Sequence, residues 1–133
     1  MSDLVSARLN LLLFSVGGLH FGVEAEQIVE VADYDGEQSE DLLWFHEELE
    51  YDAPVNGYTS PAVISTRTAD GQPYRIIIDV MEDVVEFSLN DLHLFPALVE
   101  PFVMRRGLWG ILLRNGIMVL LVDFQLLRRN KGL

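Results

Sequence analysis

The side chains that could do chemistry in this chain are mostly carboxylates, and their spacing does not build a known site. His46-Glu47-Glu48 resembles half of the helical zinc motif of metalloproteases, but no second His lies four residues away to complete a pair of ligands. Asp33-Tyr34-Asp35-Gly36 resembles the start of a calcium loop. Its Gly comes too early, however, and no Glu closes a twelve-residue loop. We therefore expect no bound metal and no other cofactor.

Nucleophilic and acid-base chemistry find equally little support. The chain has no cysteine, which excludes thiolate nucleophiles and disulfides. No serine lies in a motif that would activate its hydroxyl, and pairs of acids are expected by chance in a chain with 21 Asp and Glu residues. We predict that the protein is not an enzyme. A small-ligand-binding barrel is a separate alternative, which an enclosed cavity with converging carboxylates would favour.

The net charge and the length of the apolar stretches argue against nucleic acid and membrane as partners. The formal net charge is −12, and no Lys or Arg occurs between residues 10 and 66, which argues against binding to a phosphate backbone. The longest apolar stretches, at 9–16 and 117–122, are too short to span a bilayer. The N-terminal residues do not resemble a secretory signal. We expect a cytoplasmic protein that binds no nucleic acid and does not insert into a membrane.

Short runs of Val, Ile and aromatic residues between Gly and Asn turns predict a mostly β protein. Asn115-Gly116 is the clearest turn, because both residues accept the positive φ that a tight hairpin needs. Helical spacing of apolar residues predicts one short helix at 41–49 and another at 123–130. We interpret 54–61 as a linker with a turn at Asn56-Gly57, and 89–101 as a connection whose leucines and Phe95 cover the core. The strands are expected near 8–16, 19–24, 61–68, 73–79, 84–88, 107–114 and 117–123.

A repeated phrase suggests that the chain consists of two related halves. Val23-Glu24 begins the first copy, which ends in Val29-Glu30-Val31, and Ile78-Asp79 begins the second, which ends in Val85-Glu86-Phe87. Each copy follows a predicted strand, turn and strand. Repeats of this kind indicate duplicated structural units. We place the first half at about 1–53 and the second at about 61–133 of a single domain.

The order of strand, Gly turn, strand and acidic phrase resembles the CheW-like domain, the adaptor family of bacterial chemotaxis. The second half resembles it most fully, through Tyr74-Arg75-Ile76-Ile77-Ile78-Asp79, through Arg106-Gly107-Leu108-Trp109-Gly110 and through Leu121-Val122-Asp123-Phe124. The resemblance implies two small barrel-like β units. It also implies partners: a chemotaxis-type histidine kinase, a chemoreceptor or another CheW-like protein.

The first half departs from the family between Val31 and Asp41, where a second hairpin is expected and only nine residues are present. We interpret Ala32 to Glu40 as lacking a strand, so that the first unit is reduced by a whole hairpin. Such a loss exposes unpaired backbone groups on the neighbouring strands. The 41–49 helix, the 89–103 connection or a second chain could cover them. A homodimer through the exposed strand edge, acting as a structural scaffold, is therefore a further alternative.

The function predicted from these observations is that of a non-catalytic protein–protein adaptor in chemotaxis-type signal transduction. Apolar strand residues with a few acids between them suit such an interface, which needs no catalytic group. Glu30 and Glu86 are treated as equivalent acids at the ends of the two repeats. The predicted partner-binding residues are Val29, Glu30, Val31, Val85, Glu86 and Phe87.

Overall fold

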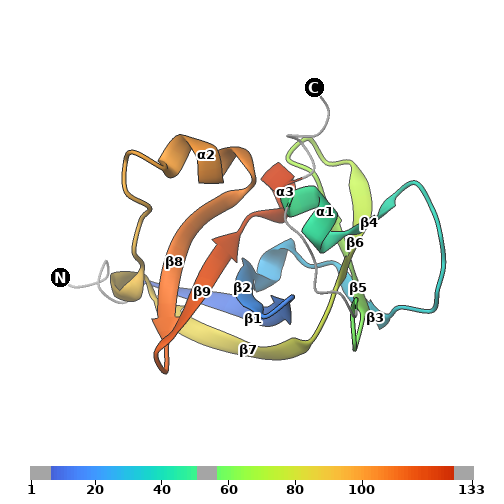
Figure 1. Cartoon of the computed structure of the whole chain (residues 1–133), viewed down its shortest axis with the longest axis horizontal. Helices are drawn as coiled ribbons and strands as arrows, with labels where there is room; N and C mark the ends of the chain where they lie inside the picture. The colour runs from blue at the N-terminus through green and yellow to red at the C-terminus, as the bar shows by residue number, and fades with distance from the viewer. Residues whose placement is uncertain (1–6, 51–56, 128–133) are drawn as a thin grey trace.

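The computed structural model describes residues 7–50 and 57–127, which form two β-sheets with short helices (Figure 1). The five-stranded sheet has the order β7-β1-β2-β9-β8 and the four-stranded sheet the order β3-β5-β6-β4. The mostly β fold with two sheet units and a few short helices is confirmed. The strands are β1 (Arg8–Val16), β2 (Leu19–Glu24), β3 (Glu30–Asp33), β4 (Leu42–Trp44), β5 (Ala62–Arg67), β6 (Pro73–Ile78), β7 (Met81–Ser88), β8 (Leu108–Arg114) and β9 (Ile117–Val122).

The same pairing scheme occurs twice. β1 and β2 form an antiparallel hairpin, as do β5 and β6. The last strand of each half then joins the hairpin of the other half in parallel: β9 pairs with β2, and β4 pairs with β6. A helix follows each of these parallel strands, α1 (Phe45–Leu49) after β4 and α3 (Phe124–Leu127) after β9. The internal duplication thus extends to the order of strand pairing.

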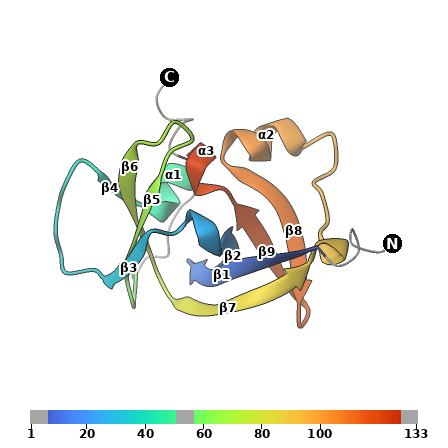
Figure 2. The same ribbon diagram turned by 180° about the vertical axis from the view of Figure 1, so that it is seen from behind.

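The two halves exchange strands. β3 leaves the first hairpin and pairs with β5 of the second, whereas β7 leaves the second hairpin and pairs with β1 of the first. Each sheet is therefore built from both halves of the sequence, as the colours in Figure 2 show: blue β1 and β2 lie beside yellow β7 and orange-red β8 and β9. Neither sheet can form without the other half of the chain.

The first unit lacks one strand rather than the whole hairpin that the sequence suggested. β4 occupies in the four-stranded sheet the place that β9 has in the five-stranded sheet, and only a counterpart of β8 is absent. The prediction that residues 32–40 contain no strand is also wrong, because β3 continues to Asp33. Its pairing with β5, rather than its own composition, makes this segment a strand.

The helix predicted at 41–49 begins four residues later, at Phe45. Leu42 to Trp44 form β4, because each residue is paired with a residue of β6. A short apolar run fits both the helical and the strand periodicity, so the sequence could not distinguish a strand of three residues from the first turn of a helix. The C-terminal helix starts at Phe124 as expected, and residues beyond Leu127 lie outside the described part, as does Asn56 of the predicted 56–57 turn.

The main core lies between the sheets and includes inward-facing residues of both hairpins. Phe14 of β1 and Phe21 of β2 stack at 5.6 Å, and Phe45 of α1 meets both rings edge-on at 5.1 and 4.7 Å. β1 is buried on both faces, since Leu11 and Leu13 belong to a second cluster with strands β8 and β9. This burial explains why β1 is a continuous apolar run rather than an alternating one.

The connection after β7 is more exposed than the sequence predicted. It contains a short 3₁₀ turn (Leu89–Asp91) and α2 (Glu100–Arg105), and α2 lies over β8. Leu92 and Phe95 are half-buried against the two core clusters. Leu94 and Leu98 are 66% and 85% exposed, so the expectation that all leucines of this segment cover the core is wrong.

Candidate functional site

An apolar groove lies between β3 and β7, two of the strands that the halves exchange. Its volume is about 430 Å³. Ile28 and Val31 form one side, and Met81 and Val84 form the other. The acidic residues Glu82 and Asp83 also line it. An open apolar groove with an acidic rim suits a protein segment with apolar side chains and nearby positive charge.

The three candidate residues of the first repeat lie on this side of the molecule. Val29 and Val31 are 61% and 38% exposed, and Glu30 is exposed between them. Val31 lines the groove itself. The backbone holds the segment in place, because Val29 N donates to Ser65 O at 2.8 Å and residues 30–33 pair with β5. Val29, Glu30 and Val31 are thus exposed on a segment that the backbone holds in place.

The three candidate residues of the second repeat divide between the two faces of β7. Phe87 is 9% exposed and packs in the second core cluster, and Val85 is half-buried against the same cluster. Both side chains contribute to the packing of this sheet, so their proposed role in partner binding stays a prediction. Glu86 points outward and pairs with Arg8 at 3.8 Å. Val84, which sequence reasoning missed, is 56% exposed and lines the groove. Strict alternation from Glu86 would have found it.

Glu30 and Glu86 are not equivalent positions in the fold. Glu30 lies opposite Ser65 of β5. When the two hairpins are aligned, Ser65 corresponds to Ser15 of β1, and an acid equivalent to Glu30 would therefore lie near Ser15. The residue close to Ser15 is instead Val80, whose O accepts the Ser15 N–H, and Glu86 lies farther along β7, opposite Asn10. β7 is twice as long as β3 and contains a register shift, so the repeated phrases separate in space.

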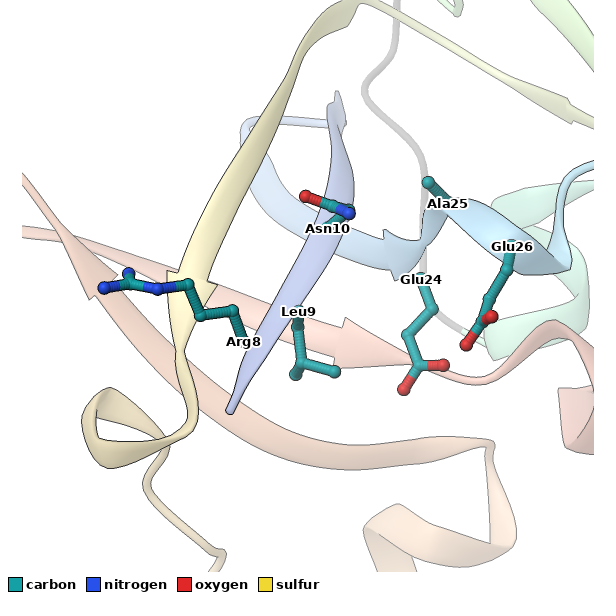
Figure 3. A pocket seen from close by; sticks show the side chains of 6 residues that line it. All are labelled: Arg8, Leu9, Asn10, Glu24, Ala25 and Glu26. Carbon is teal, nitrogen blue, oxygen red and sulfur yellow. The ribbon is translucent and has the colours of Figure 1, made fainter. Parts of the chain in front are cut away.

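Asp79 and Glu24, the acids near the start of the two repeated phrases, also differ in their surroundings. Asp79 is 6% exposed and accepts hydrogen bonds from the backbone N–H groups of Thr59 and Ser60 at 3.0 and 2.6 Å. Glu24 instead lines a second depression of about 450 Å³ (Figure 3). Partial burial, followed by the nearby charges of Glu26 and Asp123, raises the pKa of Glu24.

A small-ligand site would need several converging carboxylates, and the residues that line this depression include two, Glu24 and Glu26. In Figure 3 the side chains of Glu24 and Glu26 point the same way, whereas the guanidinium of Arg8 points away from them. Asp123 is already engaged, because its Oδ1 accepts hydrogen bonds from Gln27 Nε2 and from Gln125 N. Within residues 7–50 and 57–127, no group of three or more His, Asp or Glu side chains could hold a metal ion.

His46 and His20 have an aromatic and an acidic neighbour, respectively, rather than a catalytic arrangement. His46 Nδ1 lies 2.9 Å from Tyr58 Oη, and burial raises the pKa of Tyr58 to about 12. His20 Nδ1 lies 3.5 Å from Glu82 Oε2 at the edge of the five-stranded sheet. Neither pair contains an activated nucleophile. In the described part of the chain, no helix is long and apolar enough to cross a membrane.

Comparison with known proteins supports the architecture. No protein-family model matches the sequence, and no curated protein matches it. Among solved structures, the chain is similar to the scaffolding protein TtCheW from Thermoanaerobacter tengcongensis, with a TM-score of 0.72 and 14% sequence identity over 96% of this chain and 97% of that one. The fold is therefore CheW-like along nearly the whole chain.

Proposed function

We propose that this chain is a non-catalytic adaptor of a bacterial chemotaxis-type signalling system. Its partners would be the regulatory domain of a histidine kinase, the cytoplasmic tip of a chemoreceptor or another CheW-like protein, and it would act in the cytoplasm. The observation that carries the proposal is the acid-rimmed apolar groove between β3 and β7. The CheW-like fold of a named scaffolding protein supports it.

The groove suits a helical segment. Val31 and Val84 come from different sheets, so a ligand lying between them contacts both units at once. An amphipathic helix presents apolar side chains three and four residues apart and can place them along such a groove. The carboxylates of Glu82 and Asp83 would favour a helix with Lys or Arg beside its apolar stripe and would disfavour an acidic one.

Calorimetric titration against purified kinase regulatory domain, receptor-tip hairpin and CheW-like fragments tests the proposal. We expect wild type to bind at least one fragment and Val84→Lys to bind it more weakly. Leu113→Lys is a matched control, since Leu113 is 59% exposed on β8 and Val84 is 56% exposed on β7. If wild type binds none of the fragments but binds a small metabolite, the adaptor role must be abandoned.

A further inference from the structure

The segment before β8 presents an apolar surface that the CheW-like role described above does not use. We define the α2 patch as Leu94, Leu98, Val99, Phe102 and Met104, whose exposed fractions range from 40% to 85%. The chain is already helical at its start, because Glu100 N donates to Pro96 O and Phe102 N to Val99 O. Leu98 and Phe102 are therefore about one turn apart and face the same side.

The α2 patch ends in positive charge. The guanidinium of Arg105 lies over the Phe102 ring, 5.8 Å from its centroid, so the cation is next to the largest exposed apolar side chain. Arg106 follows and pairs with Glu50 at 3.6 Å. In a chain with a net charge of −12, the α2 patch is thus an apolar surface with a basic end. Exposed apolar side chains gathered on one short segment in this way point to an interaction site.

The groove between β3 and β7 has the complementary character. It is apolar along Ile28, Val31 and Val84, and it carries Glu82 and Asp83. The two surfaces cannot meet within one molecule. α2 packs on β8 at one end of the molecule, whereas β3, which forms one side of the groove, lies at the other end (Figures 1 and 2).

We propose that the occupant of the α2 patch is a second copy of this chain, whose β3/β7 groove receives Leu98 and Phe102 while Arg105 approaches Glu82 and Asp83. The contact is heterologous, head to tail, because the two surfaces are different and lie at different ends of the molecule. A contact of this type can continue from copy to copy into a ring or a filament. It differs from a homodimer through an exposed strand edge, because no backbone pairing is involved.

The inference rests on the proposed function in one respect, since it uses the same groove as the adaptor's partner. Self-association would then compete with partner binding, and a partner that fills the groove would disassemble the oligomer. The attraction between Arg105 and the acidic rim should weaken with added salt, whereas the apolar contact should persist.

Sedimentation velocity of the full chain tests the proposal through two variants, each of which loses one surface. Phe102→Glu removes the α2 patch and keeps the groove; Val84→Lys removes the groove and keeps the α2 patch. We expect the wild-type mass to rise with concentration and to fall with salt, and we expect each variant alone to remain monomeric. An equimolar mixture should form a one-to-one dimer and nothing larger, because it contains one functional patch and one functional groove.

The controls distinguish this contact from general effects. Leu113→Glu and Leu113→Lys place the same charges on an equally exposed apolar position of β8 and should associate like wild type. A wild type that stays monomeric at all accessible concentrations would overturn the proposal. So would a mixture of the two variants that fails to dimerise. Titration with the kinase and receptor fragments is a separate measurement. A chain that binds a fragment but stays monomeric would contradict self-association alone, and a chain that self-associates but binds no fragment would contradict the adaptor function alone.

Discussion

Gln27 and Asp123, which are 96 residues apart in the sequence, are joined by a hydrogen bond of 3.1 Å from Gln27 Nε2 to Asp123 Oδ1. The side-chain oxygen of Gln27 accepts the N–H of Phe124 at 2.9 Å, and its backbone oxygen accepts Thr66 Oγ1 at 2.7 Å. One residue thus connects the end of the first hairpin to the start of α3 and to β5. It holds the two sheets together at their junction.

Replacing Gln27 by Ala should therefore destabilise the whole fold. The change removes both side-chain hydrogen bonds and leaves the N–H of Phe124 without its acceptor, which costs about 1–3 kcal/mol. Urea unfolding measures the loss. Gln125→Ala is the control, because the Gln125 side chain is exposed and should change stability by no more than about 0.5 kcal/mol. Equal stability of the two variants would contradict the junction role of Gln27.

Glu30→Lys should weaken binding to a kinase or receptor fragment without weakening the fold. The side chain is exposed on β3, next in the sequence to Val31 of the groove, so we expect stability within about 0.5 kcal/mol of wild type and a lower affinity for a basic ligand. Glu86→Lys is the comparison, since Glu86 lies on β7 away from Glu30 and pairs with Arg8. Calorimetry on the three proteins decides the matter: equal binding by all three would show that a different face is used.

Phe87→Ala and Val84→Ala test which face of β7 is buried. Phe87 packs in the second core cluster, so its truncation should cost about 3 kcal/mol or more. Val84 is more than half exposed, so its truncation should cost little and should act on binding instead. Thermal unfolding and fragment titration separate the two effects. The reverse order of stability would place the strand in the opposite orientation.

Gly116→Val should destabilise the β8–β9 hairpin. Asn115 and Gly116 have φ of 53° and 80°, the left-handed values that a two-residue turn requires, and a β-branched side chain is strained there. We expect a loss of about 1 kcal/mol or more, visible as a lower melting temperature. Asn115→Gly is the control, because Gly accepts the same φ. A Gly116→Val protein with wild-type stability would mean that the turn is formed differently.

Arg75 should make stability depend on pH in the acidic range. It donates to both carboxylate oxygens of Glu37 at 2.9 and 2.6 Å and to Asp41 at 3.1 and 3.2 Å, which fixes the connection before β4. The hydrogen bonds from Arg75, and then that from Ser39, lower the pKa of Asp41 from 3.8 to about 2. A lowered pKa means that this stabilisation is complete above about pH 4 and is lost as the pH falls towards 2.

Arg75→Gln should therefore be less stable than wild type at neutral pH by about 0.2–1 kcal/mol, because the pairs are partly exposed and screened. The difference between the two proteins should shrink as the pH falls from 4 towards 2. Urea unfolding at several pH values measures it. Arg67→Gln, a change at an exposed position of β5, should show no such pH-dependent difference. A difference that is constant with pH would exclude the carboxylate pairs as its source.

The sequence by itself determined those features that depend on neighbouring residues. The alternation and turn residues placed seven strands within a few residues of their observed ends, and Asn115-Gly116 specified its hairpin because its φ preferences are local. The lack of cysteine excluded disulfides and thiolate nucleophiles, and the spacing of His and acidic residues argued against the known zinc and calcium motifs. The repeated phrase indicated a duplication, which the pairing scheme repeats.

Tertiary structure decided whatever depends on a distant partner. β4 is a strand because β6 pairs with it, and its three residues carry no period of their own. The exchange of β3 and β7 between sheets, and the register shift that separates Glu30 from Glu86, arise from pairings between residues that are at least 29 positions apart along the chain. The exposure of Leu98 has the same origin, because an apolar residue is buried only where the rest of the fold supplies a surface to cover it.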